Sequence, residues 1–533
     1  MQLLKDLAIA LSLANLCFFA VWADILPGSP SHYVMKAPPS SITFFAVILN
    51  VLLLAAMFWV ALALVRRLSR THALNLARWV FLVVLIVPLN GMRQQFPSLS
   101  LDSVLALVGK SGFLILGLIL ALLSVFVLLR WHRRVIRAAE TIVLVLFTFV
   151  LVTFGQAVWS SIKVYYNVPF ADYVDKPLAP LLTGRKISAP RVLWLLFDGM
   201  DQRLTFLERP RTVELSEIDR LSSQALSANN AYPPASLTLL SMPSLITGRL
   251  ISNAQPVGPN ELMITFRDAT EAVSWGTQPN VFSKARELGF NTAVVGWWHP
   301  YCRVIGDSLA DCSWQGGVWD RMRRVDLEMT LSESILNLIP ILLNTIPLTY
   351  RFQLPQRLGK ALPIRLPERN REEHIKDYLS ILKHAKDVVT NPDLGLILVH
   401  WPIPHSPYIY NRFKDDFTLD GDSSYFDNLA LVDFTLGEIR SAMESADIWE
   451  KTSVLMTSDH WYRARKIDHR VPFVLKLADQ KEPVAYDPAF NTVLIHDLIF
   501  ALLRGEVSGV DSVVSWLDQH RSKVESPEDS NNL

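Results

Sequence analysis

The chain has 533 residues, of which 50% are hydrophobic and only 19% charged, with a mean hydropathy of +0.26. Soluble proteins usually carry about 25% charged residues, so this composition excludes a disordered chain and predicts a membrane component. Lys and Arg number 51 against 50 Asp and Glu, a net charge of +1, which excludes a basic surface for nucleic acid. Three cysteines are too few for a disulfide scaffold or a cysteine-rich zinc module.

The apolar excess is concentrated in the first third of the chain. Most of the hydrophobic runs there approach the roughly 20 residues that cross a bilayer core. Buried helices of a soluble core are the alternative, but that alternative fits one such run better than several close together. The third run is the weakest, because it is short and contains Pro88. The predicted membrane spans are residues 7–23, 42–65, 76–91, 113–129 and 141–159.

Basic residues predict the orientation of these spans, because Arg and Lys favour cytoplasmic loops. The loops that alternate with the Arg-rich ones hold only Lys36 and Arg93, with Lys110 at the edge of the fourth run. The sequence therefore predicts a multi-pass protein of the cell (inner) membrane, with its N-terminus in the cytoplasm and everything after Trp159 periplasmic or extracellular. A signal peptide cleaved near Ala23 is the alternative for the first run, and it leaves the later part outside. The Arg-rich loops carry Arg66, Arg67, Arg70 and Arg78, and then Arg130, Arg133, Arg134 and Arg137.

Two cysteines, Cys302 and Cys312, lie ten residues apart in the part predicted to be exported. In an oxidising compartment such a pair favours a loop-closing disulfide. A metal site would need further ligands at short spacing, and only His299 is near. Cys17 lies in the first run and is interpreted as a small apolar residue.

From about residue 188 the pattern changes to short apolar strands that alternate with amphipathic helices. Continuous apolar strands indicate burial on both faces, and their alternation with helices predicts an α/β domain with a largely parallel central sheet. The predicted domains are a five-helix transmembrane module (1–163), a linker (164–187), the α/β domain (188–505), and a C-terminal helix with a polar tail (506–533). The predicted strands are 192–197, 291–298, 394–400, 453–457 and 471–477, and the helices are 281–288, 372–389, 426–445 and 492–503.

Polar side chains follow or precede several of these strands. In parallel sheets ligands bind beyond the carboxyl ends of the strands, so these residues are expected at one edge. Carboxylates and imidazoles together are typical of a metal site, although an Asp after a strand is more often a turn or cap residue. The residues concerned are Asp198, His400, His405, Asp459, His460, Asp468 and His469.

A hydroxyl group at the start of a predicted helix is the candidate nucleophile. Thr238 precedes an apolar stretch that ends in Thr247-Gly248-Arg249. The ordinary interpretation is a helix N-cap. The functional interpretation is that the helix N-terminus holds an anion beside the hydroxyl, while a bound metal favours the alkoxide.

These motifs, in this order, resemble the alkaline phosphatase superfamily, specifically its membrane-anchored, sulfatase-like branch. That branch includes bacterial phosphoethanolamine transferases and lipoteichoic acid synthases, which carry five spans before an extracytoplasmic domain. The resemblance covers about residues 188–480. It is carried by the strand ending at Asp198, the 238–249 segment, Pro404-His405-Ser406-Pro407-Tyr408, Thr457-Ser458-Asp459-His460, His469 before Val471-Pro472-Phe473, and the stretch 425–436.

The resemblance implies roles for individual residues. Counting nine positions back from Thr247 gives Thr238 as the nucleophile, without the Cys or Ser and the Arg of a formylglycine-dependent sulfatase. His405 and His469 match histidines that contact phosphate or protonate the leaving group. Transferases of the branch usually have Glu where this chain has Asp198, as sulfatases and nucleotide phosphodiesterases do, so transfer and hydrolysis both remain open. Asp198, Thr238, Asp459 and His460 match the ligands of one divalent metal.

Zn²⁺ fits these ligands best and Mn²⁺ is the alternative, because three oxygens dominate the set. A second metal would need an Asp-x-x-x-His pair, and that region offers His400 and His405 without the Asp. The predicted function is a membrane-anchored phosphotransferase that moves a phospholipid head group, such as phosphoethanolamine, to a hydroxyl acceptor through a phosphothreonine. The alternatives are a phosphodiesterase or phosphatase on the same site, or a non-catalytic membrane scaffold.

Overall fold

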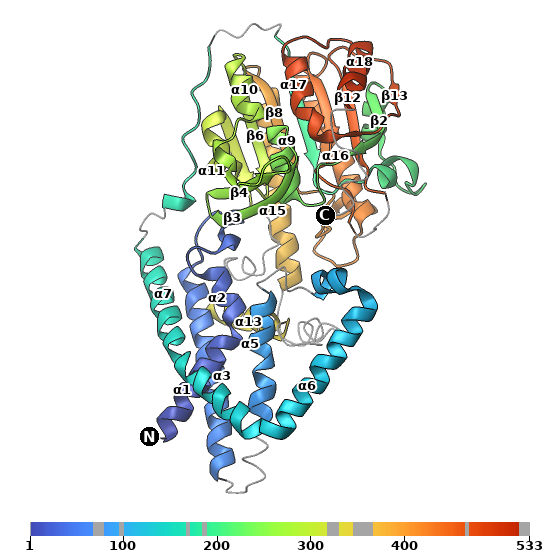
Figure 1. The fold of residues 1–533 in the computed structure, drawn as a ribbon. Helices are drawn as coiled ribbons and strands as arrows, with labels where there is room; N and C mark the ends of the chain where they lie inside the picture. Colours follow the sequence, from blue (N-terminus) through green and yellow to red (C-terminus); the bar gives the residue numbers. More distant parts are fainter. Residues whose placement is uncertain are drawn as a thin grey trace. The chain divides into compact units, whose positions relative to one another are not determined.

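The computed structural model describes residues 2–67, 79–94, 101–166, 171–183, 189–316, 330–344, 366–463 and 468–521. The chain forms two compact units (Figure 1). The first comprises residues 1–32, 38–169 and 319–366, and the second comprises 33–37, 170–318 and 367–533. The short segment 33–37 therefore belongs to the second unit, although helices of the first unit flank it in sequence. The predicted polar tail lies outside the described residues.

The first unit is helical. Two of its stretches, Ser41–Val65 and Arg130–Tyr165, are long and apolar enough to cross a membrane. A 60° bend separates α1 from α2, and this pair is a third span if it crosses as one. Within the described residues the structure thus supports two or three spans and does not confirm five, because the apolar stretches Trp79–Arg93 and Leu114–Ser124 are too short. The helices are α1 (Gln2–Cys17), α2 (Phe19–Ile25), α3 (Ser41–Arg67), α5 (Ile86–Gln94), α6 (Leu101–Val145), α7 (Phe147–Tyr165) and α13 (Leu331–Asn344).

The second unit is built on a nine-stranded mixed sheet, ordered β13-β2-β12-β11-β1-β8-β6-β7 with β14 beside β2. The strands β11, β1, β8, β6 and β7 are parallel to one another, whereas β12 runs antiparallel to both β11 and β2. All five predicted strands are present, and the prediction of a largely parallel sheet is confirmed. The strands are β1 (Val192–Phe197), β2 (Leu226–Tyr232), β6 (Asn291–Trp297), β7 (Asp311–Gln315), β8 (Leu394–Trp401), β11 (Ser453–Thr457), β12 (Val471–Lys476), β13 (Val484–Tyr486) and β14 (Phe490–Asn491).

Helices cover both faces of this sheet, which explains the continuous apolar strands. In β1, Val192, Trp194 and Leu196 pack in one core, and Leu193, Leu195 and Phe197 pack in the other. All six side chains of β1 are fully buried. The first core includes α9 (Thr238–Thr247), α10 (Val281–Glu287), α17 (Ile495–Leu503) and α18 (Val510–His520), and the second includes α8 (Ser216–Ser222), α15 (Leu366–Thr390) and α16 (Tyr425–Ser445) (Figure 1).

A second, three-stranded sheet was not predicted from the sequence. Its strands β3 (Ile251–Gly258), β4 (Glu261–Phe266) and β5 (Val273–Ser274) follow α9 directly and are antiparallel. In β4, buried residues alternate with partly buried ones, as expected of a strand with one face in the core. This sheet packs beside α9 through Ile251, Leu262 and Ile264.

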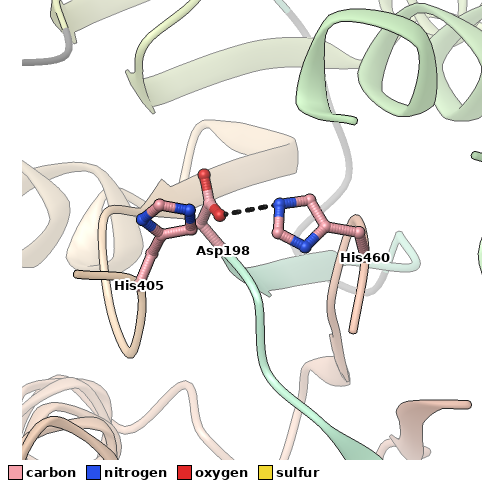
Figure 2. Close-up of side chains that lie close together, drawn as sticks. All are labelled: Asp198, His405 and His460. Atoms are coloured by element: carbon pink, nitrogen blue, oxygen red, sulfur yellow. Dashed lines mark ion pairs between the residues drawn. The ribbon is translucent and has the colours of Figure 1, made fainter. Parts of the chain in front are cut away.

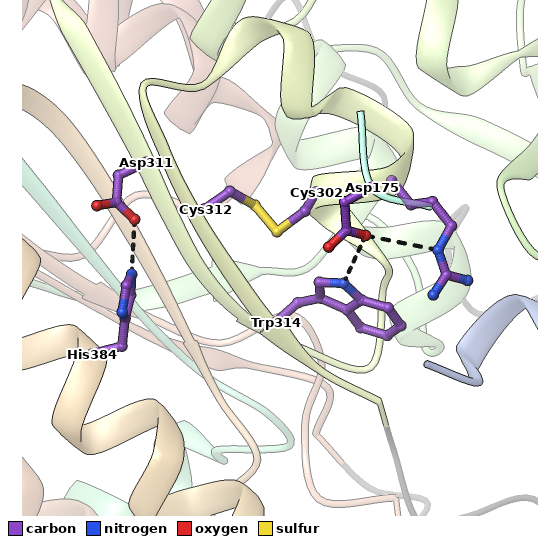
Figure 3. The surroundings of a disulfide bond; sticks show 7 residues. Asp175, Cys302, Asp311, Cys312, Trp314 and His384 are labelled. Carbon is purple, nitrogen blue, oxygen red and sulfur yellow. Dashed lines mark hydrogen bonds and ion pairs between the residues drawn. A yellow bond between two sulfur atoms is a disulfide. The ribbon is translucent and has the colours of Figure 1, made fainter. Parts of the chain in front are cut away.

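The predicted disulfide is present. Cys302 in α11 (Tyr301–Ile305) is joined to Cys312 in β7, with their Cα atoms 5.6 Å apart (Figure 3). Because β6 and β7 are neighbours in the sheet, the bond fastens the turn that follows β6 to the adjacent edge strand. The bond therefore fixes residues directly after Trp297, at the same edge as the predicted site.

An ion pair between α15 and β7 makes the stability of the second unit depend on pH. His384 Nε2 of α15 lies 2.7 Å from Asp311 Oδ1, and this hydrogen bond raises the pKa of His384 above its ordinary 6.5 (Figure 3). A histidine whose pKa is raised by folding contributes stability below the unfolded value and loses it as the pH rises through the folded pKa. We expect His384→Gln to lower the thermal unfolding midpoint more at about pH 6 than at about pH 9. An equal decrease at both pH values would contradict this assignment.

Gly248 ends α9 in the left-handed region, at φ 70°, as a helix C-cap. A Cβ atom there would overlap the His496 ring, including Nδ1. We expect Gly248→Ala to destabilise the second unit by roughly 1–3 kcal/mol, from backbone strain plus overpacking. Gly289→Ala is the matched control, since Gly289 has φ 88° but no atom within 4 Å of its Cβ position. Equal unfolding midpoints for the two variants would show that the His496 contact carries no cost.

Candidate active site

The sheet brings the predicted polar residues to one edge. Asp198 directly follows β1, Asp459 and His460 follow β11, and His400 is the second-last residue of β8. β8, β1 and β11 are parallel neighbours, so their carboxyl ends meet. His469 precedes β12. Because β12 is antiparallel to β11, the start of β12 lies at the same edge of the sheet as the carboxyl end of β11.

Four of these side chains form a fully buried cluster around Asp198. His460 Nε2 lies 3.2 Å from Asp198 Oδ1 and 3.7 Å from Asp459 Oδ2 (Figure 2 shows Asp198, His405 and His460). His400 Nε2 lies 4.0 Å from Asp198 Oδ2. The ligand atoms of Asp198, His405 and His460, and those of Asp198, His400 and Asp459, form two groups in which all atoms lie within 4.8 Å of one another.

Several of the atoms at the centre of this cluster are unsatisfied. Among the described residues, Asp198 Oδ1, His400 Nε2, Asp459 Oδ2 and His460 Nε2 are buried and make no hydrogen bond of good geometry, although His460 Nε2 contacts the two carboxylates as an ion pair. Buried polar atoms are normally paired, and leaving one unpaired costs about 1–3 kcal/mol. Carboxylate oxygens and imidazole nitrogens that converge in this way fit a divalent cation such as Zn²⁺ or Mn²⁺.

The backbone after β1 is shaped to let these rings approach. Gly199 has φ 72°, and its N–H donates to Asp459 Oδ1 at 3.3 Å. A Cβ atom at Gly199 would lie only 3.3 Å from His460 Cε1 and 3.4 Å from His405 Cδ2. A side chain at this position would therefore crowd both imidazoles, which accounts for the Asp-Gly sequence at the end of β1.

Thr238 is the first residue of α9, and its hydroxyl Oγ1 donates to Asp198 Oδ2 at 3.4 Å. The N-cap position belongs to Leu237, and no side chain caps this helix end. The structure therefore brings Thr238 to the cluster and does not use it as an N-cap. The positive end of the helix dipole lies beside the same hydroxyl.

The charges in the cluster are set by burial and by neighbouring groups. Burial raises the pKa of Asp198, but the His405 and His460 rings outweigh it and hold that pKa below the ordinary value. Burial lowers the pKa of His460, but Asp459 and Asp198 outweigh it and raise that pKa. Burial lowers the pKa of His400 and of His405. The cluster thus combines a carboxylate, Asp198, whose ionised form is favoured, with two imidazoles, His400 and His405, whose neutral form burial favours.

His405 and His469, predicted to act on the phosphate, have different surroundings. His405 Nδ1 is 2.9 Å from Ser406 O and therefore carries the proton, which leaves Nε2 to accept from Arg463 Nη2 at 3.1 Å. His469 instead stacks on Trp461, with ring centroids 4.0 Å apart, and belongs to neither ligand group of the described residues. The role of His469 in contacting the substrate remains a prediction.

Two residues of the site had only weak signals in the sequence. His400 is expected at the same sheet edge but is not among the four ligands that the resemblance implies, yet it is fully buried in the same cluster, with the Tyr301 hydroxyl 2.8 Å from its Nδ1. Its signal was a single polar residue near the end of an apolar strand. Arg463, an exposed residue, places Nη2 3.1 Å from His405 Nε2 and adds a cation beside the cluster. No local pattern marks that arginine.

Comparison with known proteins agrees with this geometry. Residues 192–525 match the family model described as type I phosphodiesterase / nucleotide pyrophosphatase. Comparison with curated protein sequences finds no match. Similar solved structures include a protein in the alkaline phosphatase superfamily from Vibrio parahaemolyticus, at 12% identity and TM-score 0.36, covering 61% of this chain and 68% of that one.

Two further similar structures are enzymes. The phosphonate monoester hydrolase of Agrobacterium radiobacter is 12% identical at TM-score 0.37, covering 59% of this chain and 74% of that one. The PsFucS1 sulfatase from Pseudoalteromonas sp. is 14% identical at TM-score 0.37, covering 59% and 68%.

The family match and the site define an enzyme of the phosphodiesterase kind. The chain belongs to the type I phosphodiesterase / nucleotide pyrophosphatase family.

Proposed function

We propose that this protein cleaves a phosphodiester bond with Thr238 as the nucleophile, forming a phosphothreonine intermediate that water then hydrolyses. The observation that carries the proposal is the position of Thr238 Oγ1, 3.4 Å from Asp198 Oδ2 at the N-terminus of α9. A bare threonine hydroxyl is a weak nucleophile and needs activation. The family match to phosphodiesterases and the Asp at position 198 both favour hydrolysis of a diester.

Asp198, Thr238, Asp459 and His460 would hold one divalent metal, and Zn²⁺ fits them best. Bound there, the metal supplies Lewis-acid polarisation of the phosphoryl oxygen and favours deprotonation of the hydroxyl. His400 lies beside the same atoms and is positioned by Tyr301, as ligating histidines usually are by a second hydrogen bond.

The protein groups around this centre supply the remaining steps. The N-terminus of α9 favours the negative charge of the phosphoryl group. Arg463 lies next to His405 and is placed to pair with a second phosphoryl oxygen. When Arg463 turns from His405 to the phosphoryl oxygen, the lone pair of His405 Nε2 becomes available to accept the proton of Thr238 or of the attacking water. The oxygen of the departing alcohol takes its proton from water or from an imidazolium formed in the first step.

A second candidate keeps the same covalent step but passes the phosphoryl-linked group from a phospholipid to a hydroxyl acceptor. It is favoured by the helices of the first unit that are apolar enough to span a membrane, Ser41–Val65 and Arg130–Tyr165. A soluble substrate gives no reason for such helices, whereas a phosphoethanolamine-like lipid head group does. In this candidate the second unit faces the periplasm or the cell exterior.

The test uses the full chain in detergent with added Zn²⁺ and two donors, bis(4-nitrophenyl) phosphate and phosphatidylethanolamine. Hydrolysis predicts release of nitrophenol, and of free phosphoethanolamine from the lipid, with no acceptor present. Transfer predicts that lipid turnover requires an added hydroxyl acceptor, which becomes modified. Absence of turnover of both donors by protein that has bound metal would overturn both candidates.

A further inference from the structure

A tyrosine far from the site in sequence is connected to the candidate nucleophile. Tyr33 belongs to the segment 33–37, which lies between α2 and α3 in sequence but is part of the second unit. Its hydroxyl is 3.0 Å from His299 Nδ1, across 266 residues of chain. Both side chains are almost completely buried, at 1% and 0% exposure. A buried contact over such a separation is formed only by the tertiary fold.

His299 continues this connection to α9. Its Nε2 atom is 3.0 Å from the carbonyl oxygen of Thr238. A carbonyl oxygen can only accept, so Nε2 carries the ring proton and donates it. Nδ1 of the neutral ring then holds the lone pair and accepts from the Tyr33 hydroxyl. The Thr238 carbonyl therefore selects the Nε2–H tautomer of His299, and the Tyr33 hydroxyl, which donates to Nδ1, holds the ring in this orientation.

The His299 ring is enclosed by other aromatic rings. Those of Trp298 and Trp275 have centroids 4.7 Å and 5.1 Å from it, both edge-on, and that of Tyr301 is 5.7 Å away. Trp298 has φ 69°, a left-handed conformation that is uncommon for a bulky residue. Strained backbone of this kind persists where the surrounding structure fixes it, and it is concentrated at functional sites.

Arg303 fixes the segment that carries Tyr33. Its guanidinium donates to Met35 O at 3.0 Å and to Lys36 O at 3.3 Å, and also to Pro259 O at 3.0 Å. Arg303 is only 2% exposed, and it follows the disulfide-bonded Cys302 in α11. The segment 33–37, of which Tyr33, Val34 and Met35 are buried, is thus held by its backbone carbonyls, independently of the Tyr33 hydroxyl.

We propose that Tyr33 is a positioning residue of the active site, which acts through His299 to hold the first residue of α9 so that Thr238 Oγ1 stays at Asp198. The segment between the first two apolar helical regions of the chain therefore completes a site whose other residues all lie after position 197. The catalytic consequence rests on the proposed function, whereas the hydrogen-bond relay does not.

The first experiment is Tyr33→Phe in the full chain, which removes one oxygen and keeps the ring. We expect kcat for bis(4-nitrophenyl) phosphate to fall roughly tenfold, the effect of about one hydrogen bond in the transition state, with KM and bound metal unchanged. Tyr378→Phe is the matched control, because Tyr378 is also fully buried and makes one side-chain hydrogen bond, to Thr435 Oγ1 at 2.8 Å. Equal kcat values for the two variants would overturn the proposal.

Whether the hydroxyl acts through His299 is tested with His299→Gln, whose amide can still donate to Thr238 O. We expect Tyr33→Phe to have no further effect on kcat in that background. An undiminished tenfold effect in the double variant would show that Tyr33 acts by another route. If Tyr33→Phe folds poorly by itself, kcat is compared between His299→Gln and the double variant instead.

A spectroscopic measurement separates the relay from the proposed function. In full-length protein labelled with ¹⁵N-histidine, the His299 signal is identified by its loss in His299→Gln. We expect the Nε2–H tautomer in both proteins, with the Nδ1 signal shifted in Tyr33→Phe because Nδ1 loses the hydrogen bond from the Tyr33 hydroxyl. An Nδ1–H tautomer in the wild type would overturn the relay. If the tautomers behave as expected but no diester is cleaved by the wild type, the proposed function fails while the relay stands.

Discussion

Replacing Thr238 with Ala is expected to reduce phosphodiester cleavage by roughly three orders of magnitude or more, because it removes both the attacking oxygen and one proposed metal ligand. Thr238→Ser keeps both and should retain a measurable rate. Stability should change by less than about 1 kcal/mol in either variant, because Leu237 occupies the N-cap position and the Thr238 side chain caps nothing.

The control for this variant is Ser236→Ala, which removes a neighbouring hydroxyl that the structure does not place beside Asp198. A diester incubated without acceptor and quenched in acid should leave a phosphoryl adduct on the peptide that contains Thr238. An adduct on Ser236 or Ser241 would keep the chemistry but show that the nine-residue spacing selects the wrong hydroxyl. Full activity of Thr238→Ala would exclude the covalent mechanism.

Replacing Asp459 with Asn is expected to abolish tight metal binding with a moderate effect on folding. The amide keeps an oxygen for the hydrogen bond from Gly199 N, but it removes the charge of Oδ2, which faces His460 at 3.7 Å. Metal analysis of the wild type should give one ion per chain. The wild type should gain about 2.7 kcal/mol of stability at a metal concentration one hundred times Kd, and Asp459→Asn should gain almost none.

Asp201→Asn is the matched control, because Asp201 is also a buried carboxylate near the end of β1 but accepts hydrogen bonds from Leu204 N and Tyr462 N. That variant should keep its metal. Stoichiometric metal in Asp459→Asn would show that the site is misplaced. Two ions per wild-type chain would show that His400 and His405 contribute to a second metal centre around Asp198.

Much of the fold could be predicted from local sequence pattern. The run from Val192 to Phe197 is continuously apolar because both faces of β1 are covered, and that pattern depends on neighbouring residues only. The same holds for β8, β11 and β12. The polar strand β2 was not predicted, because only some of its side chains are buried and its sequence has no continuous apolar run.

The membrane module shows the limit of composition as a predictor. Five apolar runs predict five spans, but spanning also requires a helical stretch of sufficient length. Within the described residues, only Ser41–Val65 and Arg130–Tyr165 meet that condition, with the bent pair α1–α2 as a third. Bends and helix ends depend on how the helices pack against one another, and composition carries no information about that packing.

In the site, the sequence by itself determined which residues follow the strands, and hence that Asp198, Asp459 and His460 meet at one edge. Strand direction and order are enough for that conclusion. Only the tertiary structure decided which side chains face Asp198: it brought His400 into the cluster and stacked His469 on Trp461. It also brought Tyr33 to His299 across 266 residues. The physical reason is that side-chain contacts between distant segments depend on loop paths and packing, whereas the position of a residue at a strand end depends on local pattern alone.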